Sequence, residues 1–162
     1  MPDQPGVDFA VVAYREEGRW EVGGLPSWVA EDLDALLRVL RQQPSDGGTI
    51  GMVSFDDDYF VTVRLFGDDV RLLLSDVTAA EDSPLARQVL DALDLPIPEG
   101  DDLEQVQPAG DLGLFADLGI SAMDLGALCG ELDLYPDEML SDIATKLGFA
   151  EAFDQAVDAA AR

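Results

Sequence analysis

Carboxylates are the side chains of this chain most able to take part in chemistry. The 162 residues include 34 Asp and Glu against 9 Lys and Arg, which gives a formal net charge of -25. There is no histidine and one cysteine, Cys129. Because Ser–His and Cys–His pairs and the common zinc sites need histidine or several cysteines, these chemistries are excluded. What remains is acid–base catalysis by two carboxylates, or the binding of a hard cation such as calcium.

One short acidic run superficially resembles part of a calcium-binding loop. Asp56, Asp57 and Asp58 are consecutive, however, and lack the alternating spacing, the glycine and the closing glutamate of such a loop. We interpret them as a solvated hairpin turn. The chain also lacks the glycine-rich motifs that cradle nucleotides. We therefore predict no catalytic residues, no metal site and no cofactor.

The charge also argues against direct binding of nucleic acid, which needs clustered Lys and Arg to contact phosphates. Arg38 and Arg41 share one turn of a predicted helix, and Arg64 and Arg71 fall on neighbouring predicted strands. These four residues are the best candidates for a small basic patch. At this net charge, we favour a solvated surface over a nucleic-acid site.

The apolar pattern predicts a folded core, since 48% of the residues are hydrophobic. Residues 1–95 predict an α+β domain with a five-stranded, mainly antiparallel sheet in ββαβββα order and helices packed on it. The predicted elements are strands over 7–15 and 19–23, a helix over 29–40, strands over 49–55, 59–66 and 70–75, and a helix over 84–93.

The second part of the chain changes in character. Residues 96–111 hold three prolines, two glycines and a run of acids, and predict a linker. Residues 112–162 predict a small all-helical C-terminal region, in which Pro136 starts one helix and Gly148 ends it. Cys129 falls on an apolar helical stripe, so we expect a buried thiol that is not reactive.

An ordered set of segments along nearly the whole chain resembles a known family. The set comprises the hairpin over 9–22, the acidic helix over 31–40, the run Leu72 to Asp76 followed by Ala79 and Ala80, and the tail segments 110–112, 115–121, 128–129, Pro136 and 143–149. Together they resemble the tRNA adenosine deaminase-associated proteins of actinobacteria. The resemblance implies a genomic association with that deaminase. The deaminase's own zinc-site motifs are missing here, so the chain resembles the associate and not the enzyme.

We therefore expect a non-catalytic, acidic accessory protein that contacts a basic partner, with a tRNA adenosine deaminase as the candidate partner. Residues 88–162 hold 17 acids and 2 bases, a denser negative charge than residues 1–87 with 17 acids and 7 bases. Long-range attraction depends on such a field. We predict that Asp101, Asp102 and Glu104 in the linker contact the partner, and that Trp28 is a partly exposed anchor for it.

Two alternatives stay open from the sequence. In the first, the tail helices mediate homodimerisation and the charge serves solubility only. In the second, the chain is an uncharacterised carboxylate-based enzyme or a hard-cation binder. A single cysteine and the absence of an apolar leader at the N-terminus favour a cytoplasmic location without contact to a membrane.

Overall fold

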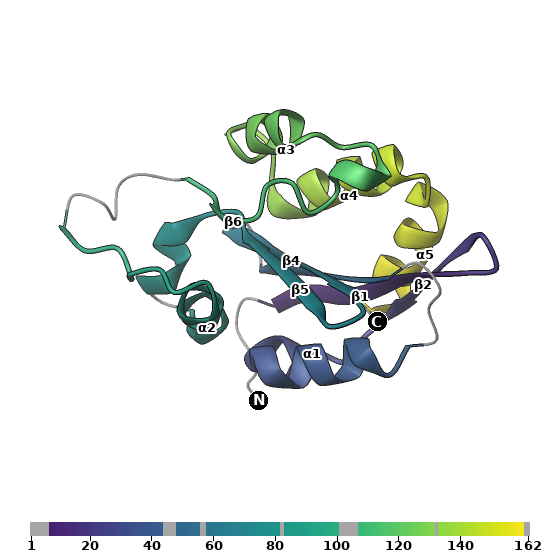
Figure 1. Cartoon of the computed structure of the whole chain (residues 1–162), viewed down its shortest axis with the longest axis horizontal. Helices are drawn as coiled ribbons and strands as arrows, with labels where there is room; N and C mark the ends of the chain where they lie inside the picture. Colours follow the sequence, from purple (N-terminus) through teal and green to yellow (C-terminus); the bar gives the residue numbers. More distant parts are fainter. Residues whose placement is uncertain are drawn as a thin grey trace.

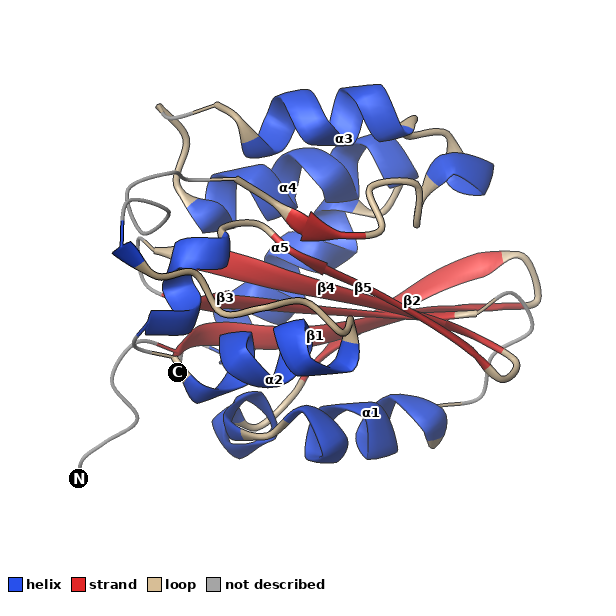
Figure 2. Ribbon diagram, turned by 60° about the vertical axis from the view of Figure 1, so that its left-hand side comes forward, coloured by secondary structure: helices blue, strands red, loops and turns tan. Residues whose placement is uncertain are grey.

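The protein has three layers, with one sheet between two layers of helices (Figure 1). The computed structural model describes residues 7–43, 48–55, 58–81, 83–100, 107–131 and 133–160. Helices α1 and α2 cover one face of the sheet, and α3, α4 and α5 cover the other (Figure 2). Among the described residues, no helix is both long and apolar enough to cross a membrane.

The sheet has six strands, and every neighbouring pair is antiparallel. Glu17 and Gly18 both have positive φ in the first hairpin, as in the turns that match the natural twist of paired strands. The α+β class and the ββαβββα order are confirmed, with a sixth strand in addition to the five predicted. In spatial order the strands are β2 (Arg19–Gly24), β1 (Val7–Glu16), β3 (Thr49–Phe55), β4 (Tyr59–Phe66), β5 (Asp69–Leu74) and β6 (Ala109–Gly110).

Residues with special backbone preferences set the helix ends. Ser83 and Ser121 each accept a hydrogen bond from a backbone N–H of the first helical turn, as N-caps do. Gly148 ends a helix with φ of 97°, a left-handed conformation that glycine adopts without strain. The helical segments are η1 (Ser27–Glu31), α1 (Leu33–Arg41), η2 (Val77–Glu81), α2 (Pro84–Ala92), η4 (Ala116–Leu118), α3 (Ala122–Cys129), α4 (Pro136–Leu147) and α5 (Ala150–Ala160).

The prediction of one continuous helix over 29–40 is wrong. The segment is a 3-10 turn followed by α1, and Asp32 between them is extended, with φ of -149° and ψ of 123°. The first N–H of α1, from Leu33, donates to the side-chain oxygen of Gln88 at 2.6 Å. Because this acceptor comes from α2, a tertiary contact satisfies a helix end that lacks a side-chain cap of its own.

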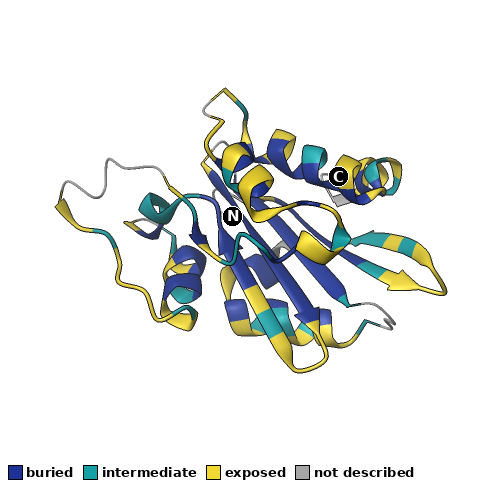
Figure 3. Ribbon diagram, turned by 45° about the horizontal axis from the view of Figure 1, so that its top comes forward, coloured by how far each residue is buried: buried dark blue, intermediate teal, exposed yellow. Residues whose placement is uncertain are grey.

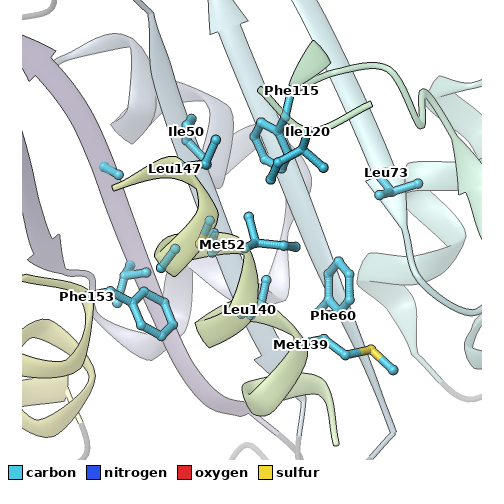
Figure 4. Close-up of a cluster of buried hydrophobic side chains, with 14 of the residues drawn as sticks. Ile50, Met52, Phe60, Leu73, Phe115, Ile120, Met139, Leu140, Leu147 and Phe153 are labelled. Carbon is cyan, nitrogen blue, oxygen red and sulfur yellow. The ribbon is translucent and has the colours of Figure 1, made fainter. Parts of the chain in front are cut away.

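The central strands of the sheet are buried (Figure 3). The two faces of the sheet belong to separate hydrophobic clusters. Along β1, Phe9, Val11 and Ala13 face the C-terminal helices, while Ala10 and Val12 face α1 and α2. The C-terminal helices thus share one core with the sheet (Figure 4). Members of that core include Phe9, Ile50, Met52, Phe60, Leu73, Phe115, Ile120, Leu140, Ile143 and Phe153.

The sixth strand lies inside the segment predicted as a linker. Gly110 pairs with Leu73 and has φ of 119°. A side chain at this position would lie 2.2 Å from the carbonyl oxygen of Leu72, so only glycine fits the close approach. Asp111 continues the pairing by donating its N–H to that same oxygen at 2.9 Å. The chain is thereby fixed to the sheet edge just before it enters the C-terminal layer.

Two buried hydroxyl groups lie on the sheet face that the C-terminal helices cover. Ser54 and Thr62 are fully buried, and within the described part of the chain their side-chain oxygens have no hydrogen-bond partner. A buried polar group that loses water without gaining a partner lowers the stability of the fold.

Replacing Thr62 with valine is expected to stabilise the protein. Thr62→Val keeps the side-chain shape and removes the unpartnered hydroxyl, so the free energy of unfolding should rise by about 1 kcal/mol. Urea denaturation measures this change. Thr78→Val is the matched control, because the Thr78 hydroxyl donates to Asp76 at 2.7 Å and its removal should destabilise the fold. A loss of stability in both variants would contradict the prediction.

Candidate functional site: an acidic groove between two C-terminal helices

A groove of about 590 Å³ lies between the start of α4 and the second half of α5. Its floor is apolar and its rim carries carboxylates from both helices. The lining residues are Phe9, Asp137, Glu138, Ser141, Phe153, Asp154, Val157 and Asp158. A cavity of this size is in the range of ligand and side-chain binding sites.

The two carboxylates on the α4 side belong to the first turn of that helix. Acids are favourable there because the N-terminus of a helix carries partial positive charge. Glu138 is also engaged locally, since its side chain accepts a hydrogen bond from the Tyr135 N–H at 2.9 Å. Asp137 is exposed, and no ion pair joins it to a described Lys or Arg. The α4 wall thus has one carboxylate used in capping and one available to a partner.

The α5 side is built from two faces of one helix. Phe153 is buried and meets the ring of Phe9 edge-on, with 5.7 Å between the centroids, while Val157 is half-buried. Asp154 and Asp158 are exposed and stand four residues apart, so they project from one side of the helix. Among the described residues, neither has a basic partner. Two adjacent, unneutralised carboxylates therefore border an apolar floor.

The position of Asp158 is electrostatically unfavourable. It lies in the last turn of α5, where the partial charge of the helix end is negative and basic residues are favoured, and that turn contains none. Within the described part of the chain no basic side chain offsets this, and features that contradict local preference are often functional. A cation brought by a partner would remove this conflict.

The carboxylates of this groove do not form a metal centre. In the described ranges, no group of three or more Asp, Glu, Cys or His side chains is placed to hold a metal ion. The groove instead carries separate carboxylates distributed along its two sides.

The two arginines predicted to lie across the meander do so, but they form no basic patch. Arg64 and Arg71 are directly paired across β4 and β5. Arg64 is buried, and its guanidinium donates to the Leu114 carbonyl at 2.9 Å and with both nitrogens to the carboxylate of Asp117. Arg71 pairs with Asp69 and approaches Asp111. The positive charge is therefore neutralised, and a bidentate ion pair joins the sheet to the segment before α3.

The other predicted site residues are placed as follows. Trp28 is 56% exposed on η1, whose neighbouring residues pack against the opposite face of the sheet from the groove. Asp101, Asp102 and Glu104 lie outside the described residues. The contact of these four residues with a partner stays a prediction. Asp56 and Asp57, interpreted above as part of a turn, also lie outside the described residues.

A comparison with known proteins gives the family. A sequence model described as "Rv3753c-like tRNA adenosine deaminase-associated protein" matches residues 8–150. The chain belongs to this family. Protein Rv3753c of Mycobacterium tuberculosis (strain ATCC 25618 / H37Rv) is 42% identical over 152 residues, which cover 93% of this chain and 87% of that protein. No solved structure matches the chain. The resemblance noted in the sequence is thus confirmed.

Sequence reasoning missed the groove of this member of the Rv3753c-like family. A usable signal was present in α5, where Asp154 and Asp158 repeat at a helical spacing near a helix end that favours bases. The other wall and the floor come from α4 and β1, far away in the sequence. Their approach depends on the tertiary packing alone.

The ion pair between Arg64 and Asp117 should be visible in the pH dependence of stability. The hydrogen bond from Arg64 holds the pKa of Asp117 below its usual value, against the opposing effect of partial burial. Asp117 therefore stabilises the fold above its unfolded pKa, and this contribution disappears as the pH falls through its lower folded pKa. At neutral pH, Asp117→Asn should reduce the free energy of unfolding by about 1–2 kcal/mol, less than for a fully buried pair because Asp117 faces solvent.

Urea denaturation of the wild type and of Asp117→Asn at several pH values checks this. The difference in free energy of unfolding between the wild type and Asp117→Asn should become smaller at acidic pH. Glu131→Gln, at an exposed acid, is the control and should change stability by less than about 0.5 kcal/mol. A difference that is independent of pH would show that the Asp117 charge is not involved.

The single cysteine is expected to be unreactive in the folded protein. Cys129 is 3% exposed, and burial raises the pKa of its thiol to about 11. Because the thiolate is the reactive form, iodoacetamide at neutral pH should modify Cys129 only after unfolding. Mass spectrometry measures the modification. A Met123→Cys variant is the positive control, since Met123 is 83% exposed. Equal rates at both cysteines would contradict the prediction.

Proposed function

We propose that this protein is a non-catalytic accessory protein that binds a basic protein partner, and that a tRNA adenosine deaminase is this partner. The observation that carries the proposal is the acidic groove, whose carboxylates on α5 lack basic partners among the described residues. The family description links related proteins to a tRNA adenosine deaminase. The net charge of -25 supports attraction to a basic surface.

The chemistry of the two proteins supports different roles, with catalysis by the deaminase and binding by the present protein. A deaminase that acts on tRNA must present positive charge to the phosphate backbone. An acidic protein can occupy part of that surface or compete with RNA for it. The present chain has no histidine, and its one cysteine is buried with a raised pKa, so it is poorly suited to the zinc-dependent chemistry of the deaminase itself.

Co-elution tests the proposal. The protein and the tRNA adenosine deaminase of the same organism are coexpressed and run through size-exclusion chromatography with light scattering, at low and at moderate salt. We expect a complex at low salt that weakens as salt screens the charges. Separate elution at both salt concentrations would rule out a direct complex. The same measurement gives the mass of the free protein and so reports a homodimer, should one form.

The linker acids are a second proposed contact for the same partner. Charge reversal at Asp101, Asp102 and Glu104 should slow association more than it speeds dissociation, because long-range attraction acts mainly on the encounter. Surface plasmon resonance separates the two rates. An unchanged association rate would mean that these three residues do not attract the partner.

A further inference from the structure

The groove between α4 and α5 combines two properties that select different parts of a ligand. The floor is lined by the almost fully covered rings of Phe9 and Phe153 and by Val157, which is half-buried and offers aliphatic carbon to a ligand. The rim presents the carboxylates of Asp154 and Asp158 on one side, and that of Asp137 on the other. A bare cation would use only the rim, and an apolar molecule would use only the floor. A ligand that uses both must carry an apolar group between positive charges.

The packing beneath the floor makes the groove a fixed feature of the fold. Phe9 and Phe153 are 4% and 2% exposed, and both belong to the core shared by the sheet and the C-terminal helices. Their rings touch edge-on. Such a floor cannot collapse without disrupting the core, so the space above it persists in the free protein.

The arrangement of charge favours a chain segment over a metal ion. The described carboxylates nowhere form a group that could hold a metal. Asp154 and Asp158 are one helical turn apart, a separation that two cationic side chains on one segment can match. Arginine suits this role because its planar guanidinium forms paired hydrogen bonds with a carboxylate and also packs on aromatic rings.

We infer that this groove binds a segment of a protein partner in which arginine or lysine residues flank a single apolar anchor residue. The anchor packs on the half-buried Val157, above the covered rings of Phe9 and Phe153. The flanking cations reach Asp154 and Asp158 on α5, and Asp137 on α4. This inference rests on the proposed function, because it names the chemistry by which a basic partner is recognised.

The test measures binding of a short fluorescent peptide, in which arginines flank one leucine, to the full chain by anisotropy. The double variant Asp154→Lys/Asp158→Lys is expected to raise Kd by about tenfold or more. Glu31→Lys/Asp91→Lys is the matched control, because it changes the net charge equally at exposed acids of η1 and α2, on the other side of the sheet. The control should raise Kd by less than about threefold. Equal effects of both double variants would overturn the inference.

Loss of binding through misfolding is separable from loss of the site. Lysine at position 158 suits the C-terminal end of a helix better than aspartate does, so the groove variant should keep or raise its melting temperature. The Val157→Ser variant tests the anchor. It should bind the leucine peptide more weakly than the wild type does. Its affinity for a peptide with serine in place of leucine should be unchanged. An equal loss of affinity for both peptides would show that the floor does not bind the apolar anchor. Displacement of the peptide by spermidine at equal concentration would show that the groove selects only positive charge.

The deaminase serves as the second probe and separates this inference from the proposed function. If the deaminase fails to co-elute while the peptide binds in the groove, the proposed partner is wrong and the groove assignment stands. If the deaminase co-elutes equally well with the wild type and with Asp154→Lys/Asp158→Lys, the partner is right and the groove assignment is wrong.

Discussion

The burial of both faces of the sheet is the constraint on which the rest of this structure depends. β4 is buried along its length from Tyr59 to Leu65, so its residues need apolar cover on both sides. Helices α1 and α2 provide one cover and the C-terminal helices the other. Without the second layer, a continuous apolar surface on β1, β3 and β4 would face water, at about 25 cal/mol for each Å². The C-terminal helices are therefore a structural part of the sheet's core.

The attachment of that second layer relies on polar interactions as well as on apolar burial. β6 and Asp111 fix the chain to the edge of β5, and a short distance later Asp117 clamps the buried Arg64. A buried guanidinium is costly unless its hydrogen bonds are satisfied, so the segment carrying Asp117 is held in one place. The buried arginine thus links the sheet to the segment that leads into the C-terminal helices. The same ion pair removes the positive charge that a nucleic-acid site would need.

The acidic surface follows from the same constraint. With both faces of the central strands covered, most charged residues lie on the outer sides of the helices, in the connecting segments and on the edges of the sheet. The region where α4 and α5 meet over β1 combines this charge with the half-buried Val157. A surface of this kind is suited to recognition of a basic protein, and the family is described by its association with an enzyme that handles a polyanion.

The sequence by itself determined five of the six described strands, several helix ends and the family. Alternating or continuous apolar runs identify β3 to β5, and local signals such as Pro136 and Gly148 fix the ends of α4, because propensity and capping act within a few residues. It also indicated that Cys129 is buried, from the stripe on its helix.

The tertiary structure alone decided the features that join distant residues. A two-residue strand such as β6 has no periodic pattern. The N–H of Leu33 at the start of α1 finds its acceptor in Gln88, 55 residues away. The sequence predicted the strand that carries Arg64. The neutralisation of the Arg64 charge by Asp117, however, depends on a contact between residues 53 positions apart. The groove needs β1, α4 and α5 together. Local preferences cannot encode these contacts, since they arise only when apolar burial brings the layers into contact.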